Sequence, residues 1–147
     1  PVWPPQDYRG LAEVAAAVDV PIAAGENEST RYGFRELIAQ KAVDILQPSL
    51  CKVGGLLEAK KICHLASSWN VPVVLHNFLF GPGIAAMVHF AVSEPGGLFV
   101  EYPAAELEAE FLIDSPRPRD GFLEISTKPG LGVELDEEVV KRYLWSR

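Results

Sequence analysis

The chain has 147 residues, of which 48% are hydrophobic and 22% charged, as in a globular protein large enough to bury one core. Its net charge is −7 and no segment concentrates lysine and arginine, so we expect neither nucleic acid nor an anionic membrane surface as a partner. No apolar run is long enough to span a membrane, and the first residues lack the pattern of a secretory signal.

The two cysteines, Cys51 and Cys63, match neither a metal-binding pair nor a disulfide framework. We therefore expect them to be buried, reduced thiols in a cytoplasmic protein. The chain opens on Pro-Val-Trp-Pro-Pro with no methionine and no approach to a first element. This opening is what we expect of a piece of a longer protein.

Apolar residues at helical spacing alternate along the chain with short apolar runs. The helical spacing predicts helices over about 7–18, from Ser29 to about Lys41, after Gly55 and after Gly83. The short runs predict strands at 20–25, 44–47, 71–76 and 98–102. This alternation, with strands apolar on both faces, predicts parallel strands joined by crossover helices. Up to this point an independent sheet and an arc of a barrel remain equally open.

The alternation stops near residue 104, where we place a boundary between 1–104 and 105–147. The second part contains proline and glycine turns, including Asp120-Gly121. Its Phe-Leu-Glu-Ile-Ser run at 122–126 is predicted to be a short strand. A final charged helix is expected after Asp136.

Polar side chains follow every predicted strand. They are Glu26 with Asn27, Ser49 with Lys52 nearby, His76, and Glu101. In parallel α/β folds the chemistry lies at these carboxyl ends of the strands. Each residue also has a purely structural interpretation: Glu26 and Glu28 as solvated loop carboxylates, His76 as a core histidine, and Lys52 as a solvated cation. Glu101, flanked by apolar residues, is the least easily explained as surface.

The order of these motifs resembles the enolase superfamily, in its mandelate racemase/muconate lactonizing enzyme branch, and is closest to the acid-sugar dehydratases. The motifs are Gly25-Glu26-Asn27, Gln47-Pro48-x-x-x-Lys52-x-Gly54-Gly55, Leu75-His76 and Val100-Glu101-Tyr102. The resemblance implies a modified TIM-type (βα)7β barrel, with 1–104 as its C-terminal portion. It implies that 105–147 returns towards a capping domain that, like the first barrel strands, lies outside this chain.

The resemblance also implies chemistry: a Mg²⁺ ion bound by three carboxylates stabilises the enolate formed when a proton α to a carboxylate is removed. Glu26 matches one metal ligand, and the other two would precede residue 1. His76 matches the catalytic histidine. Glu101 matches a carboxyl group that donates a hydrogen bond to the substrate carboxylate.

Ser49 is where this sequence departs from the family. Racemase-like members have an aspartate here that pairs with the histidine, and lactonising members have a lysine. A serine hydroxyl supplies no charge and is expected only to orient the ring of His76. Lys52 and Asn27 are expected as substrate-binding or orienting residues.

The expected function is Mg²⁺-dependent dehydration of a sugar acid, a lyase reaction. The alternative within the superfamily is a racemase or epimerase, and the alternative of another class is a non-catalytic relic or inert fragment. The 147 residues alone are expected to be inactive. The implied partners are a small carboxylate substrate and, in a cytoplasmic homo-oligomer, other copies of the protein.

Overall fold

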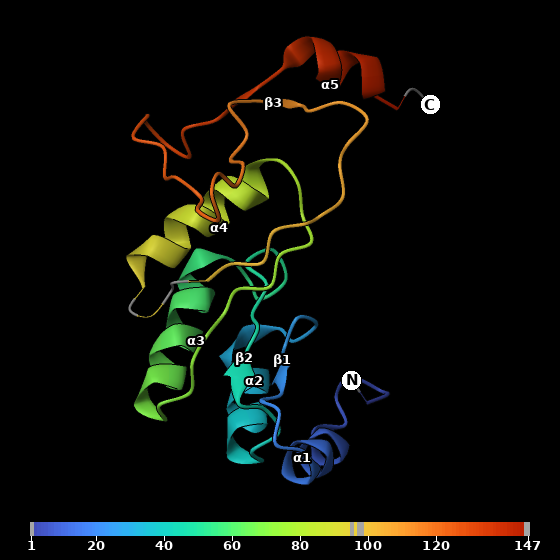
Figure 1. The fold of residues 1–147 in the computed structure, drawn as a ribbon, viewed down its shortest axis with the longest axis vertical. Helices are drawn as coiled ribbons and strands as arrows, with labels where there is room; N and C mark the ends of the chain where they lie inside the picture. The colour runs from blue at the N-terminus through green and yellow to red at the C-terminus, as the bar shows by residue number, and fades with distance from the viewer. Residues whose placement is uncertain (1, 95, 97–98, 146–147) are drawn as a thin grey trace.

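The computed structural model of the chain describes residues 2–94, 96 and 99–145. Its elements in order are α1 (Tyr8–Ala17), β1 (Ala23–Ala24), α2 (Thr30–Ala39), β2 (Ile45–Leu46), α3 (Leu56–Ser68), α4 (Pro82–Ser93), β3 (Leu112–Ile113), β4 (Glu134–Leu135) and α5 (Glu137–Tyr143). Figure 1 shows α1 and α5 at opposite ends of the long axis, with the strand segments and α2 to α4 between them. No helix among the described residues is long and apolar enough to cross a lipid bilayer.

Four strand segments in the first part of the chain lie side by side in sequence order. β1 pairs with β2 in parallel. β2 continues through a parallel bridge between Leu46 and Val73, and a second parallel bridge joins Leu75 to Val100. A helix separates each segment from the next, as α2, α3 and α4 do in turn. The predicted alternation of parallel strands and crossover helices is therefore confirmed.

The paired strands are shorter than the apolar runs that predicted them. Only two residues pair in each of β1 and β2, and the runs at 71–76 and 98–102 contribute single bridges. Leu98 lies outside the described residues. A strand extends only as far as a neighbour supplies backbone partners, and the apolar pattern does not report the length of that neighbour.

Asp44 lies where β2 begins, at the end of the sheet opposite the polar strand ends. Its Oδ2 accepts a hydrogen bond from the backbone N–H of Ile22, at 2.7 Å. This bond joins the start of β1 to the start of β2. Asp44 therefore has the stabilising role that its position before the strand predicts.

The amino end of α2 is joined to α3 by a partly exposed carboxylate. Ser29 precedes the helix, but its side chain makes no capping hydrogen bond. Glu58 of α3 supplies the cap instead, because its Oε1 accepts from the backbone N–H of Arg31 at 2.9 Å and its Oε2 lies 2.8 Å from the Arg31 guanidinium. The core between strands and helices contains fully buried Phe34, Leu37, Leu46, Val53, Ile62, Ile84 and Met87.

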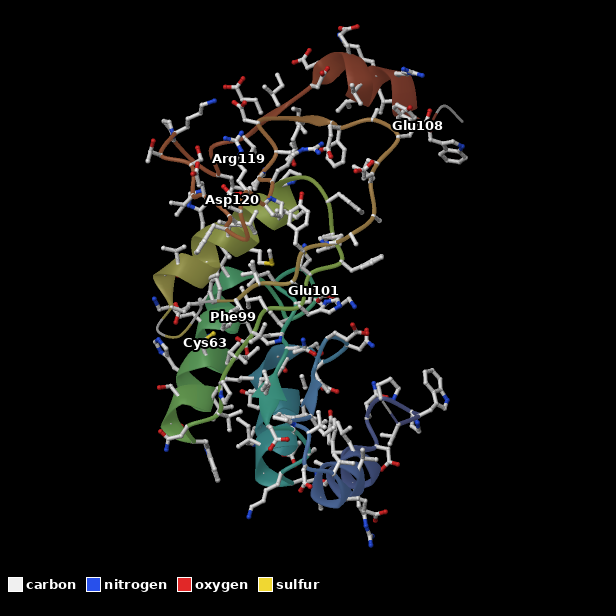
Figure 2. The ribbon with its side chains drawn as sticks, in the orientation of Figure 1. Cys63, Phe99, Glu101, Glu108, Arg119 and Asp120 are labelled. Carbon is white, nitrogen blue, oxygen red and sulfur yellow. The ribbon has the colours of Figure 1, made fainter. Side chains whose placement is uncertain are left out.

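The C-terminal part differs from its sequence prediction. The predicted strand at 122–126 is wrong, because the only pairing in this run is an antiparallel bridge between Arg119 and Phe122. Asp120 and Gly121 both have positive φ, as a tight hairpin turn requires, and Figure 2 labels Arg119 and Asp120 there. The paired strands are instead β3 and β4. The helix expected after Asp136 is confirmed as α5, with the Asp136 carboxylate accepting from its first N–H groups.

The two free cysteines lie in different environments. Cys63 of α3 lines a cavity of about 320 Å³ that Phe99 also lines, and Figure 2 labels both residues. Burial, reinforced by the Glu94 carboxylate, raises the pKa of the Cys63 thiol to about 11. Cys51, in contrast, is exposed, so the expectation that it is buried is wrong. It lies in the turn after β2, outside the core that the strand enters.

Candidate active site

The backbone pairing of the strand segments brings their polar ends together. Gln47, after β2, donates its N–H to the carbonyl of Ala24 at the end of β1. His76 donates its N–H to the carbonyl of Pro48, and Glu101 donates its N–H to the carbonyl of Leu75. Because each bond joins consecutive strand ends, the side chains that follow the strands meet at one edge of the sheet.

His76 lies between two carboxylates at this edge. Its Nε2 is 2.6 Å from Glu26 Oε2 and 3.7 Å from Glu101 Oε2. The His76 side chain is 12% exposed, whereas those of Glu26 and Glu101 are 49% and 40% exposed. The ring is therefore fixed against the protein while both carboxylates remain open to a ligand. Figure 2 labels Glu101 near the middle of the molecule.

The hydrogen bonds of His76 assign its neutral tautomer. Nδ1 is buried and has no hydrogen-bond partner among the described residues. A hydrogen on Nδ1 would be a buried donor without an acceptor, which costs about 1–3 kcal/mol. With the hydrogen on Nε2, the ring donates to Glu26 and keeps only a lone pair on the buried nitrogen. Nε2 is therefore the nitrogen that faces the open side of the site.

A chain of hydrogen bonds extends from Lys52 to His76. Lys52 Nζ donates to Asn27 Oδ1 at 3.0 Å, and Asn27 Nδ2 donates to Glu26 Oε1, also at 3.0 Å. The other oxygen of Glu26 is then the one that contacts His76. Because ammonium only donates and carboxylate only accepts, the orientation of the Asn27 amide is determined from both sides. Lys52 and Asn27 therefore orient Glu26.

Ser49 is buried, with 1% of its surface exposed. Its carbonyl oxygen accepts from the N–H groups of Lys52 and Val53, so Ser49 begins the turn that carries Lys52. The expected hydrogen bond from its hydroxyl to the ring of His76 is absent, since His76 Nδ1 has no partner among the described residues and Nε2 contacts carboxylates.

In the full-length protein we expect Ser49→Ala to change turnover by no more than about threefold, because no hydrogen bond to His76 is lost. The measurement is the steady-state rate with the best sugar acid found. A loss as large as that of His76→Ala would show that the hydroxyl takes part in the reaction.

Asn77 is a polar residue of this edge that the sequence prediction did not assign. It is 2% exposed, and its backbone N–H donates to Glu101 Oε2 at 3.0 Å. Its side-chain Nδ2 donates to the carbonyl of Leu79 at 3.3 Å. The signal that was available is an asparagine directly after the candidate histidine, within an otherwise apolar segment.

The described residues by themselves form no complete site for a metal ion. No group of three or more His, Cys, Asp and Glu side chains among them could hold a metal ion. Glu26, which follows β1 and is 49% exposed, has the exposure and the strand-end position that such a ligand needs. Mg²⁺ is bound through oxygen ligands, commonly one or two carboxylates with water and substrate oxygens, so Glu26 fits as one member of a larger set.

Parallel strand segments alternating with helices, with acid and imidazole side chains at their carboxyl ends, are typical of enzymes of the α/β barrel type. A family model described as Enolase C-terminal domain-like matches residues 1–139. The chain belongs to this family, within the enolase superfamily.

Two curated relatives are sugar-acid dehydratases. The D-xylonate dehydratase of Haloferax volcanii is 34% identical over 96% of this chain and 35% of its own length. The D-galactonate dehydratase of Variovorax paradoxus is 33% identical over 85% of this chain, again covering 35% of the relative. The chain therefore spans about a third of the length of these relatives.

Solved structures of the same superfamily have the same fold. The 3,6-anhydro-D-galactonate cycloisomerase of Zobellia galactanivorans matches 97% of this chain and 41% of its own, with a TM-score of 0.88 and 35% identity. A mandelate racemase/muconate lactonizing enzyme-like protein of Rubrobacter xylanophilus matches 98% of this chain and 37% of its own, with a TM-score of 0.88 and 37% identity. The resemblance in the order of the motifs is confirmed.

Proposed function

We propose that the full-length protein containing this chain removes a proton α to a carboxylate and eliminates water from a sugar acid. The observation that carries this proposal is the position of His76, with Nε2 within 2.6 Å of Glu26 and 3.7 Å of Glu101 at one edge of the sheet. Similarity to dehydratases of D-xylonate and D-galactonate supports the same class of substrate.

Three side chains of this chain have roles in the proposed reaction. Glu26 would be one ligand of a Mg²⁺ ion, which would supply Lewis-acid stabilisation of the enolate. Glu101 binds the carboxylate of the substrate by a hydrogen bond. His76 transfers a proton at Nε2, the ring nitrogen that faces the open side of the site.

In the forward direction the C–H bond α to the carboxylate breaks and a base takes the proton. The C–O bond to the β-hydroxyl then breaks, and His76 donates the proton with which that hydroxyl leaves as water. The enol that remains takes up a proton at the carbon that lost its hydroxyl and releases its own O–H proton, which gives a 2-keto-3-deoxy acid. No oxidant or reductant is needed, because the keto acid and the water together contain the atoms and electrons of the substrate.

A racemase or epimerase is the second candidate, favoured by similarity to proteins of the mandelate racemase/muconate lactonizing type. Racemisation needs a base on each face of the α-carbon. Among the described residues, His76 is the one imidazole at this edge of the sheet. Two curated relatives of this chain are sugar-acid dehydratases, so dehydration remains the preferred function.

The proposal is tested by screening the full-length protein, with Mg²⁺ present, against a library of sugar acids that includes D-xylonate, D-galactonate and L-rhamnonate. We expect at least one acid to lose water and to give a 2-keto-3-deoxy product. Inversion of an acid without loss of water would instead assign the second candidate. No change in any acid would favour a protein that keeps the fold and lacks catalysis.

A further inference from the structure

Asn77 is buried beside the proposed reaction centre and has no role in the reaction described above. Asn77 is 2% exposed, whereas the neighbouring Glu101 side chain is 40% exposed. Such a buried amide is retained at low cost only when its donors and acceptor have partners. The side chain of Asn77 donates to Leu79, and its backbone N–H donates to Glu101.

We propose that Asn77 is a positioning residue that fixes the carboxyl group of Glu101; this inference rests on the proposed function. The Asn77 backbone N–H donates to Glu101 Oε2 at 3.0 Å. The same oxygen is the one that lies 3.7 Å from His76 Nε2. The Asn77 N–H therefore holds Oε2 on the side of His76, and we infer that Oε1 is the oxygen that faces a substrate.

The side chain of Asn77 determines where its own N–H points. Nδ2 donates to the carbonyl of Leu79, two residues further on, and so closes the turn that follows His76. The far end of this turn packs on α4, because a Cβ atom added at Gly83 would lie 3.6 Å from Leu79 Cβ. Contacts at both ends therefore fix the conformation of this turn, and they fix the orientation of the Asn77 N–H that donates to Glu101.

The carboxyl group of Glu101 needs a hydrogen bond that fixes its position. Its side chain is 40% exposed and would otherwise sample several rotamers. A hydrogen bond to the substrate accelerates the reaction only if the donor is already in place, because reorientation during the reaction consumes binding energy. Loss of the hydrogen bond that positions Glu101 should therefore lower kcat. The KM for the substrate should stay nearly unchanged, because other groups also bind the substrate.

The test uses four versions of the full-length protein: the parent, Asn77→Asp, Glu101→Gln, and the double variant, with the sugar acid from the screen as substrate. Aspartate has the shape of asparagine and cannot donate to Leu79. We expect Asn77→Asp to lower kcat about 10- to 100-fold and to change KM by less than about threefold. In the Glu101→Gln background it should lower kcat by no more than about twofold.

Asn70→Asp is the matched control, since Asn70 is exposed and precedes the start of the same strand; its kcat should equal that of the parent. Equal losses from Asn77→Asp in the two backgrounds, or no loss at all, would overturn the inference. If Asn77→Asp does not fold, Asn77→Ala, which also lacks a side-chain donor, takes its place in the cycle.

A second readout separates failure of this inference from failure of the proposed function. The unfolding midpoints of the same four proteins report coupling between Asn77 and Glu101 without any substrate. We expect the two substitutions to be non-additive. Additive shifts overturn the inference, even where the parent is active on sugar acids. Non-additive shifts in a protein inactive on every acid support the contact and reject the proposed function.

Discussion

His76→Ala in the full-length protein is expected to abolish the loss of water from sugar acids, with a decrease in kcat of at least about a thousandfold. General acid–base catalysis by one side chain typically contributes 10² to 10⁴ in rate, and His76 is the only imidazole described at this edge of the sheet. Steady-state rates with the acid found in the screen provide the measurement.

The matched control for this substitution is His64→Ala. The His64 side chain is 66% exposed on α3, where its nearest acidic group is Glu94. Its replacement should leave kcat within about twofold of the parent, as is usual for surface substitutions. A His76→Ala protein that still turns over at a tenth of the parent rate would remove His76 from the reaction.

Glu26→Gln is expected to weaken Mg²⁺ binding by the full-length protein about a hundredfold or more and to reduce turnover at limiting Mg²⁺. The amide keeps the size of the side chain but has a single acceptor oxygen, so it can accept from Asn27 or from His76 and not from both, and it carries no charge. Mg²⁺ prefers charged oxygen ligands, and an amide oxygen is a poor replacement. Titration calorimetry with MgCl₂ measures the effect.

Glu13→Gln is the control for the metal prediction, because Glu13 is an exposed carboxylate on α1 with only Arg9 beside it. Its Mg²⁺ affinity should match that of the parent. The 147-residue chain by itself is expected to show no stoichiometric Mg²⁺ binding, since its described residues supply one ligand. Equal affinity of the parent and Glu26→Gln proteins would place the metal elsewhere.

The meeting of Glu26, His76 and Glu101 could be predicted from sequence because parallel strands fix where their ends lie. Once the alternation of strands and helices is recognised, every residue directly after a strand belongs to one edge of the sheet. Side-chain direction matters little for these three, since each emerges at a strand end. The hydrogen bonds from His76 and Glu101 to the preceding strand show that this part of the prediction depends on the backbone alone.

The hydrogen bonds that position these three side chains could not be predicted from the sequence. Lys52 contacts Asn27, twenty-five residues away in sequence, through a turn whose shape no local pattern reports. Asn77 acts on Glu101 through its backbone, and a backbone N–H has no signature in the sequence. Glu28 was expected in solvent, yet it is only 9% exposed. It lies near Tyr8, and burial together with the Glu28 carboxylate raises the pKa of Tyr8 to about 12.

The C-terminal prediction failed for a different reason. The run at 122–126 has strand-forming residues, but strand formation depends on a partner with matching length and register. The partner of β3 is β4, and residues 114–133 separate the two. The Asp120-Gly121 turn closes too soon after Arg119 for the run to reach another strand.

The central claim is that this edge of the sheet removes a proton α to a carboxylate and lets water leave. The most direct measurement incubates the full-length protein with Mg²⁺ and the sugar acids in deuterium oxide and follows products by NMR and mass spectrometry. The account predicts a 2-keto-3-deoxy acid with one deuterium on the carbon that lost its hydroxyl, and no such product with His76→Ala. An unchanged set of acids, with neither deuterium at the α-carbon nor loss of water, would contradict it.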